Sequence, residues 1–77
     1  MRYFFDFRDG DTFIEDKIGV ECVDLAAAKV EASAGLAGYA KDVIAGSERR
    51  EMAVEVRTNK GSMLTTKMVF DIEHLDT

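Results

Sequence analysis

The side chains that could carry chemistry in this 77-residue chain are few and widely spaced. Its single cysteine, Cys22, and its single histidine, His74, cannot make a Cys/His zinc site within one chain. Cys22 precedes an expected helix, but Glu21 and Asp24 oppose formation of a thiolate, so we interpret Cys22 as a structural or incidental thiol. General-base chemistry at His74 would require a nucleophile or carboxylate from elsewhere, so we interpret it as a lone surface histidine.

Four aspartates lie around one short segment: Asp6, Asp9, Asp11 and Asp16. They could suggest a cation site, but a calcium loop needs oxygen ligands at alternate positions, a glycine at the sixth place and a glutamate at the twelfth. Phe13 and Ile14 occupy places where ligands and glycine should be. The pattern therefore favours a hairpin turn with a solvated acidic rim.

Basic residues are densest at Arg49 and Arg50, which could bind phosphate, but Glu48 and Glu51 flank them and favour a solvated loop. Three methionines are interpreted as core or gap-filling residues rather than as a binding surface: Met52, Met63 and Met68. The sequence therefore predicts no catalytic, cofactor-binding or metal-binding residue, and no enzymatic activity.

The composition and charge of the chain indicate what kind of protein it is and which partners it favours. Hydrophobic residues make up 47% of the chain and charged residues 32%, which is typical of a globular protein. No apolar run is long enough for a signal peptide or a membrane span, so we expect a cytoplasmic protein without membrane association. The formal net charge is −5, and residues 1–24 carry seven acidic side chains against three basic ones. This charge disfavours nucleic acid and favours a protein partner with a basic patch.

The first residues alternate in the manner of a half-buried strand, predicted at residues 2–8. Three aromatic side chains share one of its faces: Tyr3, Phe5 and Phe7. Asp9-Gly10 favours a tight turn into a return strand at residues 12–15, and a connector is expected from Asp16 to Val23. Two registers stay open for this hairpin: Phe5 opposite Ile14 across a two-residue loop, and Phe7 opposite Phe13 across a three-residue loop.

A helix is predicted from Leu25 to Ala45, with Asp24 as its N-cap and Gly46 just beyond its end in a left-handed conformation. Its buried stripe is expected to comprise Leu25, Ala28, Ala32, Leu36, Tyr39 and Val43, widened by Val30, Ala37 and Ile44. Gly35 and Gly38 are costly inside a helix. We attribute them to close packing against bulky sheet residues, with close approach of a second subunit as the alternative.

A second hairpin is predicted after the helix, with strands at residues 51–58 and 62–73 and a turn at residues 59–61. One face of these strands is apolar: Met52, Val54 and Val56, then Leu64, Met68, Phe70 and Ile72. The order predicts a ββαββ, α+β fold in which an antiparallel sheet packs on one long helix, as a single domain over residues 1–77. Because so short a chain has a thin core and lacks disulfides, we expect a homo-oligomer, most simply a dimer.

Several segments resemble a family of short proteins from rhizobia and related alphaproteobacteria, catalogued as a domain of unknown function (DUF 6894-like). The matching segments are Arg2 to Asp11, Ile14, Asp16, Gly19-Val20-Glu21, Asp24 to Ala28, Val54 to Arg57 and Gly61. The resemblance implies a small stand-alone protein in the bacterial cytoplasm. It implies no activity, cofactor or catalytic residue, and members often carry histidine or another residue at the position of Asp6, which argues against a catalytic role there.

Three classes of function are consistent with these features. The leading hypothesis is a non-enzymatic protein-interaction or regulatory module that acts as a homodimer. The alternative is an antitoxin-like or regulatory protein associated with nucleic acid, against which the negative charge counts. The third is an enzyme or small-ligand binder whose site is assembled between subunits, because a thin core leaves little room for a pocket within one chain.

Overall fold

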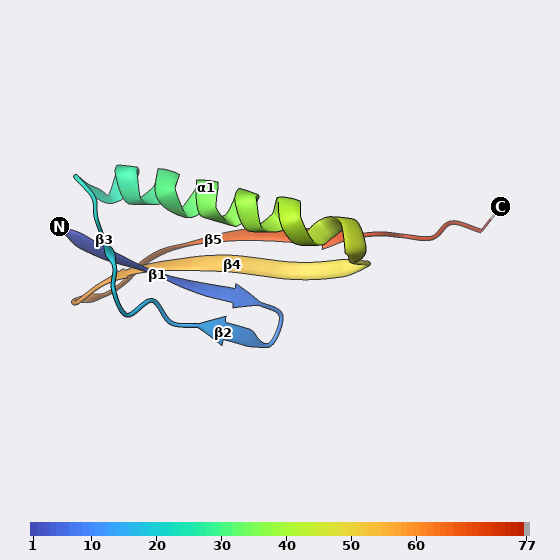
Figure 1. Ribbon diagram of the computed structural model, residues 1–77, viewed down its shortest axis with the longest axis horizontal. Coiled ribbons are helices and arrows are strands. Elements are labelled where there is room, and N and C mark those ends of the chain that lie inside the picture. Colours follow the sequence, from blue (N-terminus) through green and yellow to red (C-terminus); the bar gives the residue numbers. More distant parts are fainter. Residues whose placement is uncertain (77) are drawn as a thin grey trace.

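The computed structural model describes residues 1–76 and contains one long helix on one face of an antiparallel five-stranded sheet (Figure 1). The α+β fold predicted from sequence is confirmed. The strands are β1 (Arg2–Asp9), β2 (Thr12–Ile14), β3 (Val20–Glu21), β4 (Arg49–Thr58) and β5 (Gly61–Asp71). Helix α1 (Leu25–Val43) ends in a short 3₁₀ turn, η1 (Ile44–Gly46). No helix within residues 1–76 is long and apolar enough to cross a membrane.

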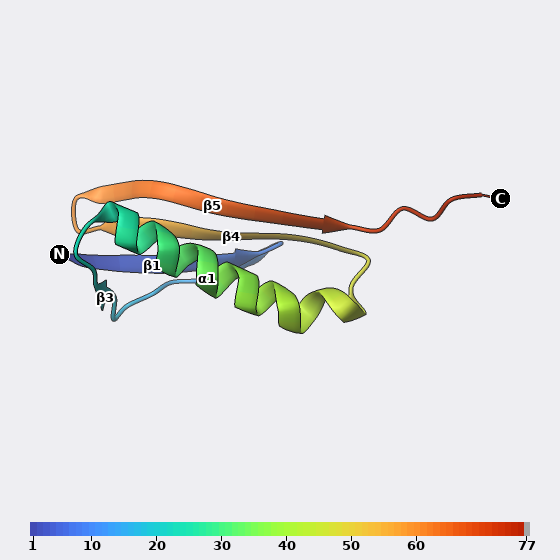
Figure 2. The same ribbon diagram turned by 90° about the horizontal axis from the view of Figure 1, so that it is seen from above.

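The strand order β2-β1-β4-β5 places β1 from before the helix next to β4 from after it, in the middle of the sheet. β1 pairs with β4, while β2 and the two-residue β3 pair with the other side of β1. β5 pairs with β4 on one side, and no other strand of residues 1–76 pairs with its outer side. Seen from above, β5 lies to one side of α1, and the chain continues past it in the same direction (Figure 2).

The first hairpin adopts neither predicted register. Phe7 lies opposite Ile14 and Arg8 opposite Phe13, so the loop is Gly10-Asp11 and begins one residue later than Asp9-Gly10. Gly10 has a φ of +59°, which glycine adopts at little cost at the first position of a tight turn. The strand extends through Asp9 because the N–H of Gly10 donates to the carbonyl of Glu51 in β4.

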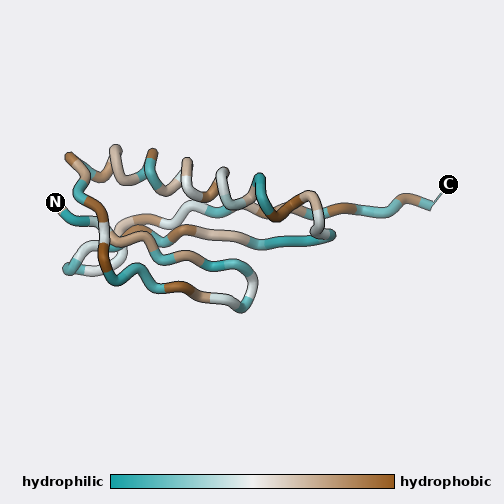
Figure 3. The backbone as a smooth tube through the Cα atoms, viewed as in Figure 1, coloured by the Kyte–Doolittle hydropathy of each residue, from teal (hydrophilic) through white to brown (hydrophobic). Residues whose placement is uncertain are grey.

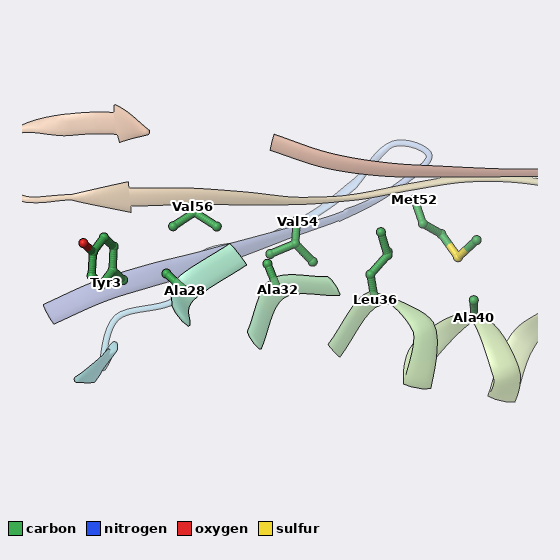
Figure 4. Close-up of a cluster of buried hydrophobic side chains, with 8 residues drawn as sticks. All are labelled: Tyr3, Ala28, Ala32, Leu36, Ala40, Met52, Val54 and Val56. Carbon is green, nitrogen blue, oxygen red and sulfur yellow. The ribbon is translucent and has the colours of Figure 1, made fainter. Parts of the chain in front are cut away.

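The core is one row of helix residues against one row of strand residues (Figure 4). Ala28, Ala32, Leu36 and Ala40 are buried at intervals of four along α1, and they face Tyr3, Met52, Val54 and Val56. The predicted stripe is confirmed for its buried and half-buried members, and it also includes Ala40. Small alanines let the helix lie close to the sheet, over β4 and β5.

Three predictions about the helix are wrong, two of them because this contact is narrow. Val30 is 68% exposed and Ala37 is also exposed, so they do not widen the stripe. A Cβ added at Gly35 or Gly38 would meet nothing within 4 Å, so close packing on the sheet does not explain these glycines. Gly46 belongs to η1 and does not have a positive φ.

Candidate interaction surface

Asp6 is buried on the sheet face opposite α1, where Arg57 of β4 neutralises it. Arg57 Nε donates to Asp6 Oδ2 at 2.7 Å, and Nη2 donates to Oδ1 at 3.3 Å. The Asp6 carboxylate is the first cause of the raised pKa of Arg57. The Arg57 guanidinium also lies 4.6 Å from the centre of the Phe4 ring, so this charge is covered on both sides. The pair holds β1 against β4.

Asp16 fills the gap between β2 and β3 along the outer side of β1. Its carboxylate accepts hydrogen bonds from the N–H groups of Phe5, Ile18 and Gly19, each at 3.0 Å, while its own N–H donates to Asp6. Desolvation alone would raise the pKa of Asp16, but these three donors and the nearby Arg57 outweigh it and lower the pKa below its usual range. The Asp16 carboxylate therefore accepts the hydrogen bond of the Phe5 N–H at a point where neither β2 nor β3 pairs with β1.

Asp9 lies on the helix side of the sheet, in a cluster that closes the far end of α1. Arg50 and the Tyr39 hydroxyl both donate to its Oδ2, and Arg50 Nε donates to Ser47 Oγ at 2.7 Å. The hydrogen bond to Asp9 is the main reason why the pKa of Tyr39 is raised. The Tyr39 ring also packs edge-on against Phe7, with 4.4 Å between centroids. This cluster joins β1, α1 and β4.

These contacts correct the interpretation of the acidic segment as a solvated rim. Asp6 and Asp9 point to opposite faces and each binds an arginine of β4. Within residues 1–76, no group of three or more His, Cys, Asp or Glu side chains is placed to hold a metal ion. Asp6 and Asp9 are therefore balanced by arginines 51 and 41 residues away, which local sequence does not reveal.

The remaining residues singled out from sequence lie apart from one another. Cys22 is half-buried, and its backbone exchanges two hydrogen bonds with that of Met1. His74 is not a lone residue, since its Nε2 lies 2.8 Å from Glu48 Oε1, although both side chains are exposed. Arg49 forms ion pairs with Glu51 and Asp71. Met52 is buried as predicted, but Met63 and Met68 are 46% and 36% exposed, so the core prediction is wrong for both.

Exposed apolar side chains outside the helix gather in two regions, residues 13–23 and β5 with the segment after it. Val69 is 59% exposed, Ile72 41% and Met68 36%. Figure 3 shows hydrophobic and hydrophilic stretches alternating along the C-terminal segment, as they do in a strand. At eleven residues, β5 is also longer than most strands. We call its unpaired outer side the β5 edge.

An apolar groove of about 660 Å³ separates α1 from β5. Its helix wall includes Ala37, Ala40 and Ile44, and its strand wall consists of Met68, Phe70 and Ile72. The exposed Ala37 is explained here, since it forms part of this wall rather than of the core. The groove and the β5 edge are continuous, because the same strand borders both.

A second apolar hollow, of about 320 Å³, lies on the other flank of α1. Phe5, Phe7, Gly35 and Tyr39 are among the residues that line it. Here the neighbouring backbone is already paired, because β2 and β3 cover the outer side of β1. The hollow therefore offers side chains alone, whereas the β5 side offers both side chains and unpaired peptide groups.

The family model described as "Domain of unknown function (DUF6894)" matches residues 2–70. The chain belongs to this family. The resemblance found in its motifs is thereby confirmed, and the match extends from the start of β1 to the penultimate residue of β5. No curated protein and no solved structure matches the chain.

Among the residues that carried the resemblance, three have structural explanations in this DUF6894 member. Asp6 and Asp16 hold the connector against β1, and Gly19 supports it with a φ of +78°. A Cβ at Gly19 would lie 3.0 Å from the carbonyl oxygen of Tyr3 and 2.9 Å from Arg2 Cγ. The motif therefore encodes a tight connection along β1.

Proposed function

We propose that this protein is a non-enzymatic interaction module that acts as a homodimer, and that the β5 edge and the adjoining groove form the contact between copies. The observation that carries the proposal is the combination of an eleven-residue outer strand with exposed apolar side chains on it. Unpaired N–H and C=O groups in a row can accept another strand.

The β5 edge lacks most of the features that protect edge strands from pairing. Natural sheets use short edge strands, proline and inward-pointing charges for this purpose. The chain has no proline, and the single β-bulge of the β4–β5 ladder lies near the turn rather than in the middle of β5. Lys67 is the one lysine in the strand. An exposed valine, Val69, lies two residues after it.

On the sheet face opposite α1, the aromatic side chains lie beside charged ones. There, Arg8 pairs with Glu55 and lies 4.4 Å from the centre of the Phe13 ring, and Arg57 covers Phe4. Ion pairs and cation–π contacts of this kind are compatible with solvent. On the β5 side, Met68, Val69 and Ile72 are exposed apolar side chains.

A second copy is the simplest partner for this surface. Within residues 1–76 the core comprises eight residues, half of them alanine or tyrosine, so this small domain buries little apolar surface. Covering Met68, Val69 and Ile72 in both copies would add to that surface, at about 25 cal/mol for each Å² removed from water. The dimer would therefore stabilise the fold as well as form the functional unit.

The test compares two valine-to-lysine substitutions by light scattering after size exclusion and by sedimentation equilibrium. Val69→Lys adds a charge to the β5 edge, and Val30→Lys makes the same change at a 68%-exposed position on the outer side of α1. The wild-type chain and V30K should be dimers, and V69K should be a monomer with an unchanged circular dichroism spectrum. A monomeric wild-type chain, or a V69K variant as dimeric as V30K, would overturn the proposal.

A further inference from the structure

We infer that two copies pair β5 with β5 in antiparallel orientation about a two-fold axis through Val69. This inference rests on the proposed function and specifies which residues meet across the interface. The spacing of charges along the strand selects this register, and the direction of its peptide groups and the continuation of the chain beyond β5 are compatible with it.

The peptide groups determine which residues can bond across the β5 edge. The N–H of Ile72 donates to the carbonyl of Glu48 at 2.8 Å, so peptide groups of even-numbered residues here face β4. Because peptide groups alternate in direction along a strand, those of the odd-numbered residues point outward. The outward-facing residues are Thr65, Lys67, Val69 and Asp71.

Two-fold pairing of these residues satisfies the outward groups reciprocally. With the axis at Val69, each Val69 exchanges two hydrogen bonds with Val69 of the second copy. Pairing through residue 73 would give about ten backbone hydrogen bonds, a typical number for a protein interface. An axis perpendicular to the sheet places both α1 helices on the same face, so the two grooves meet side by side.

The charges select Val69 as the centre. In this register Lys67 of each copy lies opposite Asp71 of the other, which gives two equivalent pairs of opposite charge. Within residues 1–76, Lys67 takes part in no ion pair, and Asp71 is 46% exposed although Arg49 contacts it. The interface would therefore supply Lys67 with a partner.

Neighbouring registers lose this match. An axis at Lys67 places two ammonium groups opposite each other, and an axis at Asp71 does the same with two carboxylates, which is destabilising. An axis at Met68 places Lys67 opposite Val69, and an axis at Phe70 places Asp71 opposite Val69. Of these five positions, Val69 alone pairs Lys67 with Asp71.

The groove and the C-terminal segment also fit this register. Met68 lies opposite Phe70 of the second copy, so the strand walls of the two grooves interlock. Residues 72–76 continue beyond β4 in the direction of β5 (Figure 1). The backbone hydrogen bond from Ile72 to Glu48 holds the start of this segment. In the dimer, Ile72 and Glu73 lie opposite Thr66 and Thr65, so the second copy extends the sheet along this segment.

A cysteine scan of the outward-facing residues tests the register. In a Cys22→Ser background, single cysteines replace Thr65, Lys67, Val69 or Asp71, and disulfide dimers are measured after mild oxidation. Cysteines at the axis would have Cα atoms about 5.5 Å apart, within disulfide range, whereas those at position 67 would be shifted by about 13 Å along the strands. We expect V69C to be oxidised to dimer far faster than the other three.

The outcomes separate the register from the dimer itself. Fastest oxidation at another position, or equal rates at positions 67 and 69, would overturn the register while leaving the dimer through the β5 edge intact. A dimer by mass in which none of the four cysteines forms a disulfide dimer would overturn the inference too. The proposed function is tested by a different measurement, the mass of the wild-type protein in solution, and a monomeric mass would overturn it.

Reversal of the charges at positions 67 and 71 gives a second test of the register. General destabilisation of the fold would not be repaired by the second substitution, whereas a lost ion pair between copies would be. Lys67→Glu should weaken the dimer about tenfold, because two attractive pairs become repulsive. Adding Asp71→Lys to K67E should restore much of the affinity, since each pair is then attractive again. No recovery in the double variant would contradict the predicted pairing of residues 67 and 71.

Discussion

Three alanine substitutions at glycines allow the contribution of the Gly19 contact to stability to be measured. Gly35→Ala adds a methyl group on the exposed side of α1, where it meets nothing within 4 Å, so better helix propensity should stabilise the protein by about 1 kcal/mol. Gly10→Ala also meets nothing, but its φ of +59° should cost about 1–2 kcal/mol.

Gly19→Ala combines the same backbone cost with a steric one. At a φ of +78°, the new Cβ would lie 3.0 Å from the Tyr3 carbonyl oxygen and 3.0 Å from Phe4 Cε2. Overpacking of this kind typically costs about 1–3 kcal/mol, so the total is about 2–5 kcal/mol. A domain of this size has about 4–12 kcal/mol of stability in all, so G19A should lose a substantial part of it.

The assay is urea unfolding followed by circular dichroism at one protein concentration, because association would make stability depend on concentration. The expected order of midpoints is G35A, wild type, G10A and G19A, from highest to lowest. If G19A and G10A unfold at the same urea concentration, the connector does not pack on β1 as described. The role assigned to Asp16 and Gly19 would then be refuted.

Two further predictions follow from ionisation. Because the pKa of Asp16 is lowered in the folded state, its stabilising effect is present above the ordinary value of 3.8 and is lost as pH falls through the lowered value. The urea midpoint should therefore fall more steeply below about pH 4 in the wild type than in Asp16→Ala. Parallel pH profiles of the two proteins would contradict this prediction. Asp9 raises the pKa of Tyr39, and a Tyr3→Phe background leaves Tyr39 as the one tyrosine that titrates. In that background, Asp9→Asn should shift the midpoint of the alkaline absorbance titration toward the ordinary value of 10.0. An unchanged midpoint would count against the hydrogen bond.

Local patterns were sufficient to predict the helix, four of the five strands and most of the inward faces, but they missed β3 in the expected connector. Alternation placed Met52, Val54 and Val56 on one buried face, and spacings of three and four identified Ala28, Ala32 and Leu36. These signals are local because strand and helix periods determine which side chains share a face. The register of the first hairpin was not predictable in this way, since it depends on Asp9 being held in β1 by contacts with α1 and β4.

The polar contacts were beyond local prediction for the same reason. Nothing near Asp6 in sequence points to Arg57, and nothing near Asp9 points to Arg50; both pairs arise only when β1 and β4 become neighbours. The β5 edge was also hidden, because its hydrophobic alternation looks like that of a covered strand. Only the strand order shows that Met68 and Val69 belong to an outer strand.

The strand order also has a consequence for how the chain folds during its synthesis. β1 is synthesised before its central partner, β4, and the connector and helix α1 are made in between. The β4–β5 hairpin needs only local contacts, whereas joining β1 closes a loop of about forty residues, a slower and entropically costlier step. The aromatic strand β1 therefore waits, with the side that β4 will cover exposed, until helix α1 and β4 have been made.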